Sequence, residues 1–270
     1  MPDSVGEENF PMHAVSSASS KMRFPPSFVS ASANKRRANK NGRGHALCCV
    51  KPFVRRCAPG SAATQRHDAT CMHNQLPVTY IARHGETPWT ITGQHTGLTD
   101  LPLTPQGEQN AKALAGRLKG MAFAKVLTSP LQRARQTCTL AGFGSVAEAE
   151  NDLVEWDYGE YEGLRSAEIR AKPPDWQLFR DGAPGGESPC QLMARADNVW
   201  RRVREVKGNV LLFASGHFIR VLAARWIGLE PSVHSNSFLL STASLSAVGY
   251  DQDCSHPVMR LWNDTHHVSI

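Results

Sequence analysis

The chain has 270 residues and 41% of them are apolar, which is enough for a sizeable core in one large domain or two small ones. No apolar run approaches the roughly 18 residues that a membrane-spanning helix needs, so the sequence argues against a membrane protein. The net charge of +6 is unevenly spread. Residues 1–71 hold eleven Lys and Arg and four acidic residues, whereas residues 72–270 hold 19 Lys and Arg and 20 acidic residues. The basic character therefore belongs to residues 1–71.

Residues 1–71 show no sustained periodicity and are rich in Ser, Ala, Asn, Arg and Pro, which predicts a disordered basic extension. Three explanations of this segment are open. The composition from Ser16 to Arg66 is typical of an organelle transit segment, and the run Lys35-Arg36-Arg37 is a candidate nucleic-acid patch that we rank below a solvated charge run. We favour a third explanation, in which Met72 is the natural start and the folded domain spans residues 72–270.

Three cysteines lie within the predicted domain, at positions 138, 190 and 254. They are scattered and form no CxxC pair, which favours neither a disulfide framework nor a zinc site. We therefore expect a reducing compartment, the cytoplasm, with an organelle as the alternative if residues 1–71 are a transit segment.

A short apolar run over residues 78–82 predicts a buried strand that ends directly at Arg83, His84 and Gly85. In open α/β sheets, ligands bind at the carboxyl ends of the strands, and a glycine there permits a sharp turn or a close approach. An arginine beside a histidine suits an anion such as phosphate, with Arg83 as a forked donor and His84 as nucleophile or acid/base.

The next elements alternate as in an α/β domain. Thr104 is placed to cap a helix that starts at Pro105, and Arg133 lies near the start of another helix, where anions are favoured. The full expected order after the first strand is a polar loop (90–103), this first helix, a strand (125–128), a helix (131–140), an aromatic and acidic loop (156–163), an irregular stretch (to 186) and a long amphipathic helix (189–206).

The run over residues 209–214 predicts the clearest core strand, and Ser215, Gly216 and His217 follow it. This repeats the design at His84, so two such turns at adjacent strand ends would converge on one pocket. Closing strands are expected over residues 237–240, 243–248 and 258–261. The fold class predicted is α/β: a single three-layer domain with a mainly parallel sheet and helices on both faces.

Four motifs in this order make the chain resemble the histidine phosphatase (phosphoglycerate mutase-like) superfamily over roughly residues 76–264. The aromatic and acidic motif, together with residues 92–100, looks most like the branch that includes sedoheptulose-1,7-bisphosphatase. The four motifs are Arg83-His84-Gly85-Glu86-Thr87, Thr96 to Thr104, Ser129 to Thr137 and Glu155 to Gly163.

The resemblance implies a two-step reaction without a metal or other cofactor. His84 would attack a phosphomonoester, Glu155 would protonate the leaving oxygen, and water would then release phosphate. Arg83 and Arg133 would hold the phosphoryl oxygens, where positioning and electrostatics provide most of the rate. Nearby Asp157, Glu160 and Glu162 are rivals of Glu155 for the acid role.

Four further residues are candidate substrate contacts. Thr96 and Gly97 align with a loop near the phosphate, and Thr90 stands where many relatives carry a phosphate-contacting Asn. Tyr158 either lines the pocket or packs in the core.

The main departure from the family pattern is at Ser215, where relatives carry the second catalytic histidine. His217 lies two residues further on. A hydroxyl can donate a hydrogen bond but brings no positive charge, and losing one oriented donor costs on the order of 10²–10³ in rate. Four outcomes stay open: a weakened phosphatase, recruitment of His217 to the pocket, an engineered variant that traps a ligand, and binding without turnover.

The predicted function is hydrolysis of a small phosphorylated metabolite, by preference a sugar phosphate or bisphosphate, through a phosphohistidine. A phosphoglycerate mutase-type phosphotransferase is a weaker alternative, because Arg165 and Arg170 lie well apart where mutases carry paired arginines. A non-catalytic protein that binds a phosphate ligand is the alternative of a different class. Nucleic-acid binding through residues 35–56 ranks last.

Overall fold

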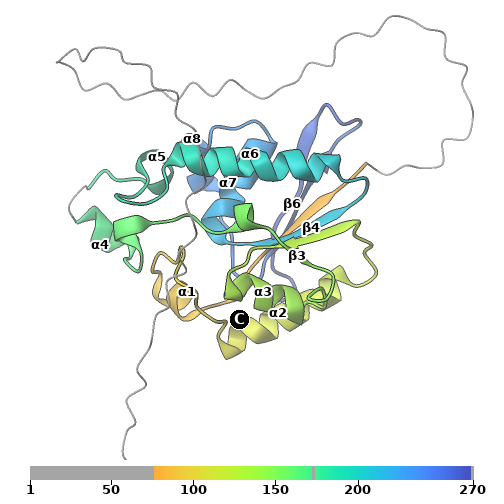
Figure 1. Cartoon of the computed structure of the whole chain (residues 1–270), viewed down its shortest axis with the longest axis horizontal. Helices are drawn as coiled ribbons and strands as arrows, with labels where there is room; N and C mark the ends of the chain where they lie inside the picture. The colour runs from red at the N-terminus through yellow and green to blue at the C-terminus, as the bar shows by residue number, and fades with distance from the viewer. Residues whose placement is uncertain (1–75, 172–173, 269–270) are drawn as a thin grey trace, which may run out of the picture.

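The structure is a computed structural model that describes residues 76–171 and 174–268 (Figure 1). The expectations for residues 1–71 lie outside this part of the chain. Of the helices in these two ranges, none has the length and apolar character that a bilayer crossing requires.

One six-stranded sheet forms the centre of the molecule, in the order β3-β2-β4-β1-β5-β6. The pairs from β3 to β1 are parallel, whereas β5 is antiparallel to both of its neighbours. The strands are β1 (Thr79–Arg83), β2 (Lys125–Thr128), β3 (Glu148–Ala149), β4 (Val210–Ala214), β5 (Leu245–Tyr250) and β6 (Pro257–Asp264). The predicted α/β class with a mainly parallel sheet is confirmed.

Helices cover both faces of the sheet, as Figure 1 shows, with α2 and α3 on one face and α6 and α7 on the other. Strand β4 has to be apolar throughout because it is buried on both faces: Leu211 and Phe213 join one core cluster, and Val210, Leu212 and Ala214 join the other. The helices are α1 (Pro88–Thr92), α2 (Pro105–Leu118), α3 (Gln132–Leu140), α4 (Ser166–Arg170), α5 (Leu178–Asp181), α6 (Pro189–Glu205), α7 (Gly216–Trp226) and α8 (Pro231–His234).

Two helix starts expected from the sequence, at Pro105 and Pro189, are confirmed by their caps, whereas the helix expected from residue 131 begins at Gln132 without a side-chain cap. Thr104 accepts a hydrogen bond from the Gly107 N–H at 3.0 Å, and proline follows it at the first helical position. Ser188 and Gln191 form a reciprocal capping box at the start of α6. Such contacts lie within one turn of chain, so a local pattern suffices to predict them.

Three local predictions are wrong. The loop expected over residues 90–103 starts only after Thr92, because its first three residues belong to α1. Residues 237–240 were expected to form a strand, but no strand is present there, and a short 3₁₀ turn covers Ser235–Ser237. Instead, the Phe238 ring packs on Trp262 of β6 with centroids 5.3 Å apart. The stretch before residue 186 was expected to be irregular, yet it contains α4 and α5, because Ile169, Leu178 and Phe179 are buried in the core. Tertiary burial overrides weak local propensity in this stretch.

Candidate active site

The carboxyl ends of three neighbouring strands meet at one edge of the sheet. β1 and β4 pair in parallel with Arg83 opposite Ala214, and the His84 N–H donates to the Ala214 carbonyl at 3.0 Å. At the end of β2, the Ser129 N–H donates to the Phe213 carbonyl at 2.9 Å. The two strand-end turns predicted to converge therefore do so.

His84 is buried, with 3% of its surface exposed, and its Nδ1 lies 2.8 Å from the Gly85 carbonyl oxygen. Because a carbonyl only accepts, Nδ1 carries the proton and donates, which leaves Nε2 with a free lone pair. Burial, followed by the charges of Arg133 and Arg83, lowers the pKa of His84 well below its usual value. A neutral imidazole of fixed tautomer is the form that a nucleophile requires.

Gly85 makes its close approach to another part of the backbone. A Cβ at this position would lie 2.6 Å from the Gly107 carbonyl oxygen, so no side chain fits between the turn and α2. The Gly85 N–H donates to the Thr137 hydroxyl at 2.9 Å. Gly85 thus anchors the turn that presents His84.

The Arg83 guanidinium lies against the first residue of α7, because a Cβ at Gly216 would be 3.1 Å from its Nε and Cζ atoms. Nη1 donates to the Leu240 carbonyl, and Nε is buried without a partner. Burial lowers the pKa of Arg83 to about 10, with nearby Glu155 acting in the opposite direction. Arg83 therefore keeps a donor available beside the start of α7.

Arg133 is completely buried and points its guanidinium at the loop of residues 96–99. Nη1 donates to the Thr99 carbonyl at 3.0 Å, and Nη2 donates to the carbonyls of Thr96 at 3.1 Å and Gly97 at 2.8 Å. Nε has no partner. Burial lowers the pKa of Arg133 while Glu155 opposes this. The loop thus aims the guanidinium.

The same loop is held on its other side by Glu162. The Gly97 N–H donates to both carboxylate oxygens at 2.9 and 3.0 Å, and the Thr99 N–H donates to Oε1 at 3.1 Å. A Cβ at Gly97 would lie 2.4 Å from the Trp156 carbonyl oxygen, so only glycine fits. Gly97 therefore helps to position Arg133 through its carbonyl, while its N–H donates to Glu162.

The two threonines proposed as substrate contacts also make bonds within the protein. The Thr96 hydroxyl donates to the Gln94 carbonyl at 3.3 Å. The Thr90 hydroxyl donates to the Thr87 carbonyl and accepts from the Thr87 N–H, both at 2.8 Å, within the capping box of α1.

Glu155 is buried and lies at the N-terminus of α7. Its Oε2 accepts from the His217 N–H at 2.9 Å, and its Oε1 accepts from the N–H groups of Phe218 and Trp156, also at 2.9 Å. Free N–H groups and the helix dipole favour an anion at such an end. Among the rivals for the acid role, Glu160 is exposed, Glu162 binds the loop of residues 96–99, and Asp157 accepts from the Gly159 N–H.

Ser215 and His217 differ sharply in their surroundings. The Ser215 hydroxyl is fully buried and has no hydrogen-bond partner. His217 Nδ1 lies 2.5 Å from the hydroxyl oxygen of Tyr158, and its ring packs near those of His95 and Phe179 at centroid distances of 5.6 and 5.5 Å. Burial, followed by the charge of Arg220, lowers the pKa of His217 well below its usual value. Tyr158 is also buried. Its ring packs in the core, and its hydroxyl forms the hydrogen bond with His217.

Arg220 lies near Glu155 and Arg83 and was not among the candidate residues predicted from the sequence. It lies on α7 three residues after His217, and this spacing puts both on one face of the helix. Its Nε is buried without a partner, and burial lowers its pKa while Glu155 acts in the opposite direction. The sequence signal that could have identified Arg220 was its i, i+3 spacing from His217 on the predicted helix.

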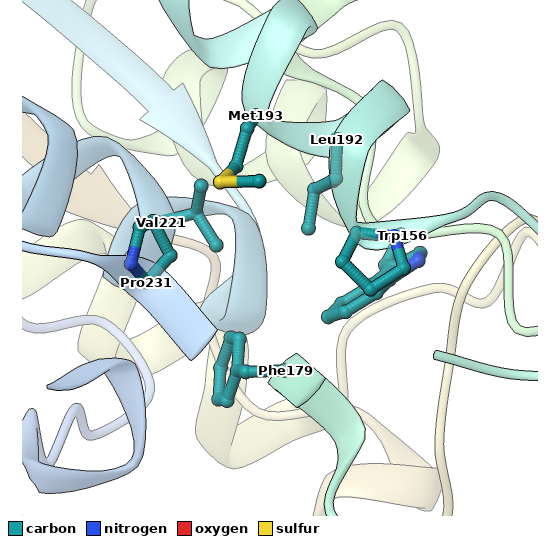
Figure 2. A pocket seen from close by; sticks show the side chains of 7 residues that line it. Trp156, Phe179, Leu192, Met193, Val221 and Pro231 are labelled. Atoms are coloured by element: carbon teal, nitrogen blue, oxygen red, sulfur yellow. The ribbon is translucent and has the colours of Figure 1, made fainter. Parts of the chain in front are cut away.

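Figure 2 shows an apolar pocket that includes Trp156, the residue after Glu155. Trp156 and Phe179 meet the side chains of α6 and α7 there, but the space between them does not hold a water molecule. Its remaining lining residues are Pro189, Leu192, Met193, Val221 and Pro231. We assign this pocket to the packing of the core.

Comparison with known proteins agrees with the geometry. A family model described as the histidine phosphatase superfamily (branch 1) matches residues 79–265. An acid phosphatase of Mycobacterium tuberculosis is 40% identical over 176 residues, which cover 63% of this chain and 85% of that protein. A sedoheptulose 1,7-bisphosphatase of Saccharomyces cerevisiae is 34% identical over 190 residues, which cover 58% of this chain and 70% of that protein.

Among solved structures, the product of an open reading frame of Mycobacterium tuberculosis superposes with a TM-score of 0.66 at 34% identity, covering 70% of this chain and 98% of that one. This likeness confirms the phosphoglycerate mutase-like fold. The matched residues run from β1 to the end of β6 and thus include every strand of the sheet. The chain therefore belongs to branch 1 of the histidine phosphatase superfamily, a family of phosphatases and phosphomutases.

Proposed function

We propose that the protein hydrolyses a small phosphorylated metabolite, by preference a sugar phosphate or bisphosphate, through a phosphohistidine on His84. The observation that carries this proposal is a set of buried polar atoms without partners around a neutral histidine. Such atoms are costly unless a ligand satisfies them. They are Arg83 Nε, Arg133 Nε, Arg220 Nε and the Ser215 hydroxyl.

The proposed first step is attack of His84 Nε2 on phosphorus. The bond between phosphorus and the ester oxygen breaks as the new N–P bond forms, and Glu155 passes a proton to the leaving oxygen. Glu155 must enter this step protonated, a form that the negative charge of the bound phosphate favours. The proton fits on Oε2, which accepts one hydrogen bond whereas Oε1 accepts two. Its place between Arg83, Arg133 and Arg220 is supported by their electrostatic interactions with it.

In the second step, water attacks the phosphorus, Glu155 takes the proton of that water, and the N–P bond breaks. Phosphate leaves and His84 returns to its neutral form. The three guanidinium groups would stabilise the charge on the phosphoryl oxygens in both steps. Ser215 would add a neutral donor where relatives carry a histidine, so we propose a weakened enzyme.

The preference for a sugar phosphate rests on the resemblance of residues 92–100 and 155–163 to the sedoheptulose-1,7-bisphosphatase branch, which the yeast relative supports. Two of the described cysteines, Cys138 and Cys254, are free thiols, which favours the cytoplasm as the place of reaction.

A second candidate is a protein that binds a phosphate ligand without turnover. Ser215 favours it, because the buried hydroxyl keeps the anion site polar while the charge of a second histidine is missing.

The test is phosphate release from a panel of sugar mono- and bisphosphates by the full chain and by Ser215→His, with acid-labile label mapped to residue 84. Release by both chains with a label on His84 supports the phosphatase. If neither chain releases phosphate from any substrate, although both bind inorganic phosphate, the binding protein is the correct assignment.

A further inference from the structure

A turn formed by residues 239–244, which we call the support turn, contacts both Arg83 and His84. The Arg83 N–H donates to the Ser244 carbonyl at 3.0 Å, and the Ala243 N–H donates to the His84 carbonyl at 3.0 Å. The Leu240 carbonyl accepts from Arg83 Nη1. The support turn therefore fixes the backbone of both residues and the direction of the Arg83 guanidinium.

The support turn adopts a backbone conformation that is unfavourable by itself. Ala243 has φ of 56°, a left-handed value that is rare for residues with a Cβ. The turn makes one internal side-chain bond, from the Ser244 hydroxyl to the Ser241 carbonyl at 2.7 Å. Strained residues of this kind persist only where surrounding groups hold them. The groups that hold the support turn thus bear on the site.

These groups come from β6 and the residues just after it. Asn263 Oδ1 accepts from the Ser241 N–H at 2.7 Å, and Trp262 Nε1 donates to the Leu239 carbonyl at 2.7 Å. His267 Nε2 lies 2.8 Å from the carbonyl oxygen of Ala243, the strained residue itself. Since a carbonyl only accepts, His267 Nε2 must donate.

We propose that Asn263 and His267 are positioning residues for the phosphate site. They hold the support turn, and the turn holds Arg83 and His84 in the geometry that phosphate binding and attack require. The proposal rests on the proposed function for the role of His84 but concerns the anion site, which can be measured without turnover. Within the part of the chain that the structure describes, the donated bond is the only hydrogen bond of the His267 ring, because its Nδ1 is buried without a partner there.

The test exploits the two different nitrogens of His267. In His267→Gln the side-chain amide nitrogen reaches about the place of Nε2, whereas in His267→Asn it reaches only that of Nδ1. We expect His267→Asn to weaken binding of inorganic phosphate by about fivefold to tenfold, the effect of one lost hydrogen bond, while His267→Gln stays within about twofold of the parent. His256→Asn is the matched control, because His256 lies in the β5–β6 turn with 73% of its side chain exposed.

A second variant guards against a simple loss of folding. Asn263 has φ of 55°, so Asn263→Gly removes the amide without adding backbone strain. We expect it also to weaken phosphate binding at a temperature where thermal melts show the chain folded. Unchanged phosphate binding in both His267→Asn and Asn263→Gly, or equal losses in the Asn and Gln variants of His267, would overturn the proposal.

Turnover measured in the same variants on a Ser215→His background separates the two claims. If this background releases no phosphate from any substrate while His267→Asn still weakens phosphate binding, the positioning role stands and the phosphatase assignment fails. If it does release phosphate and His267→Asn leaves both kcat and KM unchanged, the positioning role fails alone.

Discussion

The turns that follow β1 and β4 share one design and differ in where the histidine stands. Both follow a buried strand, contain a glycine and lie side by side in the sheet. After β1 the histidine comes first, and His84 presents a free Nε2 at the strand end. After β4 serine comes first, and His217, two residues later and already in α7, is bound to the Tyr158 hydroxyl.

The two histidines therefore lie in different surroundings, His84 at the strand end and His217 inside α7. Ser215 is the N-cap of α7, with an extended backbone (φ −110°, ψ 164°), whereas His217 lies inside the helix. The Ser215 hydroxyl is buried and has no partner among the described residues, whereas the His217 ring contacts the aromatic cluster of His95, Tyr158 and Phe179. That His217 does not take over the role of the histidine that relatives carry at position 215 stays a prediction, which the variants below test.

Removing the nucleophile is expected to have the largest effect. His84→Ala should lower phosphate release by at least about 10³-fold, because the residue that forms the covalent intermediate is lost. The measurement is steady-state phosphate release on the Ser215→His background, where the starting rate is highest. Residual turnover above about a tenth of the parent would show that another group attacks phosphorus.

Restoring the histidine after β4 should sharpen the comparison of the two turns. Ser215→His is expected to raise kcat by about 10²–10³-fold, because it returns an oriented donor to the site. Ser215→Ala is the control, which deletes only a neutral hydroxyl and should change kcat far less. If Ser215→His turns over no faster than the parent chain, the serine is not the element that limits the rate.

The buried histidines predict a loss of stability in mild acid. Burial lowers the pKa of His84 and His217, and it lowers that of His95 to about 4. The unfolded chain then binds more protons below its own histidine pKa of about 6.5, and the free energy of unfolding should fall by about 1.4 kcal/mol per pH unit for each such histidine. For His95 the loss spans the window from about pH 6.5 down to 4.

Denaturant melts between pH 7.5 and 4.5 would measure this slope. His95→Gln removes one titrating group and should make the slope shallower. An equal slope in the parent and the His95 variant would mean that His95 titrates alike in the folded and unfolded chains.

Removing His217 should have the smallest effect on turnover. His217→Gln loses the bond to Tyr158 and is expected to lower the melting temperature by several degrees, as the loss of about 1 kcal/mol would. Phosphate release on the Ser215→His background should change by less than about tenfold, the cost of roughly one hydrogen bond. A loss comparable to that of His84→Ala would place His217 in the role that relatives give to their second histidine.

By itself, the sequence determined the features that depend on neighbours along the chain. The buried strands β1, β2 and β4, the caps at Thr104 and Ser188, and the candidates Arg83, His84, Arg133 and Glu155 could all be read from it. Each depends on apolar runs, on capping pairs within one helical turn, or on a motif of contiguous residues, and the free energy of such features is mostly local.

Only the tertiary structure decided which distant groups meet. It pairs Ala82 with Phe213. It also brings N–H groups of α7 to donate to Glu155, and it directs the Arg133 guanidinium to donate to carbonyls in residues 96–99. It also turned residues 237–240 from an expected strand into a loop that packs on Trp262. The physical reason is that burial and hydrogen-bond satisfaction are properties of the whole packed chain, and they outweigh local propensities of a few tenths of a kcal/mol per residue.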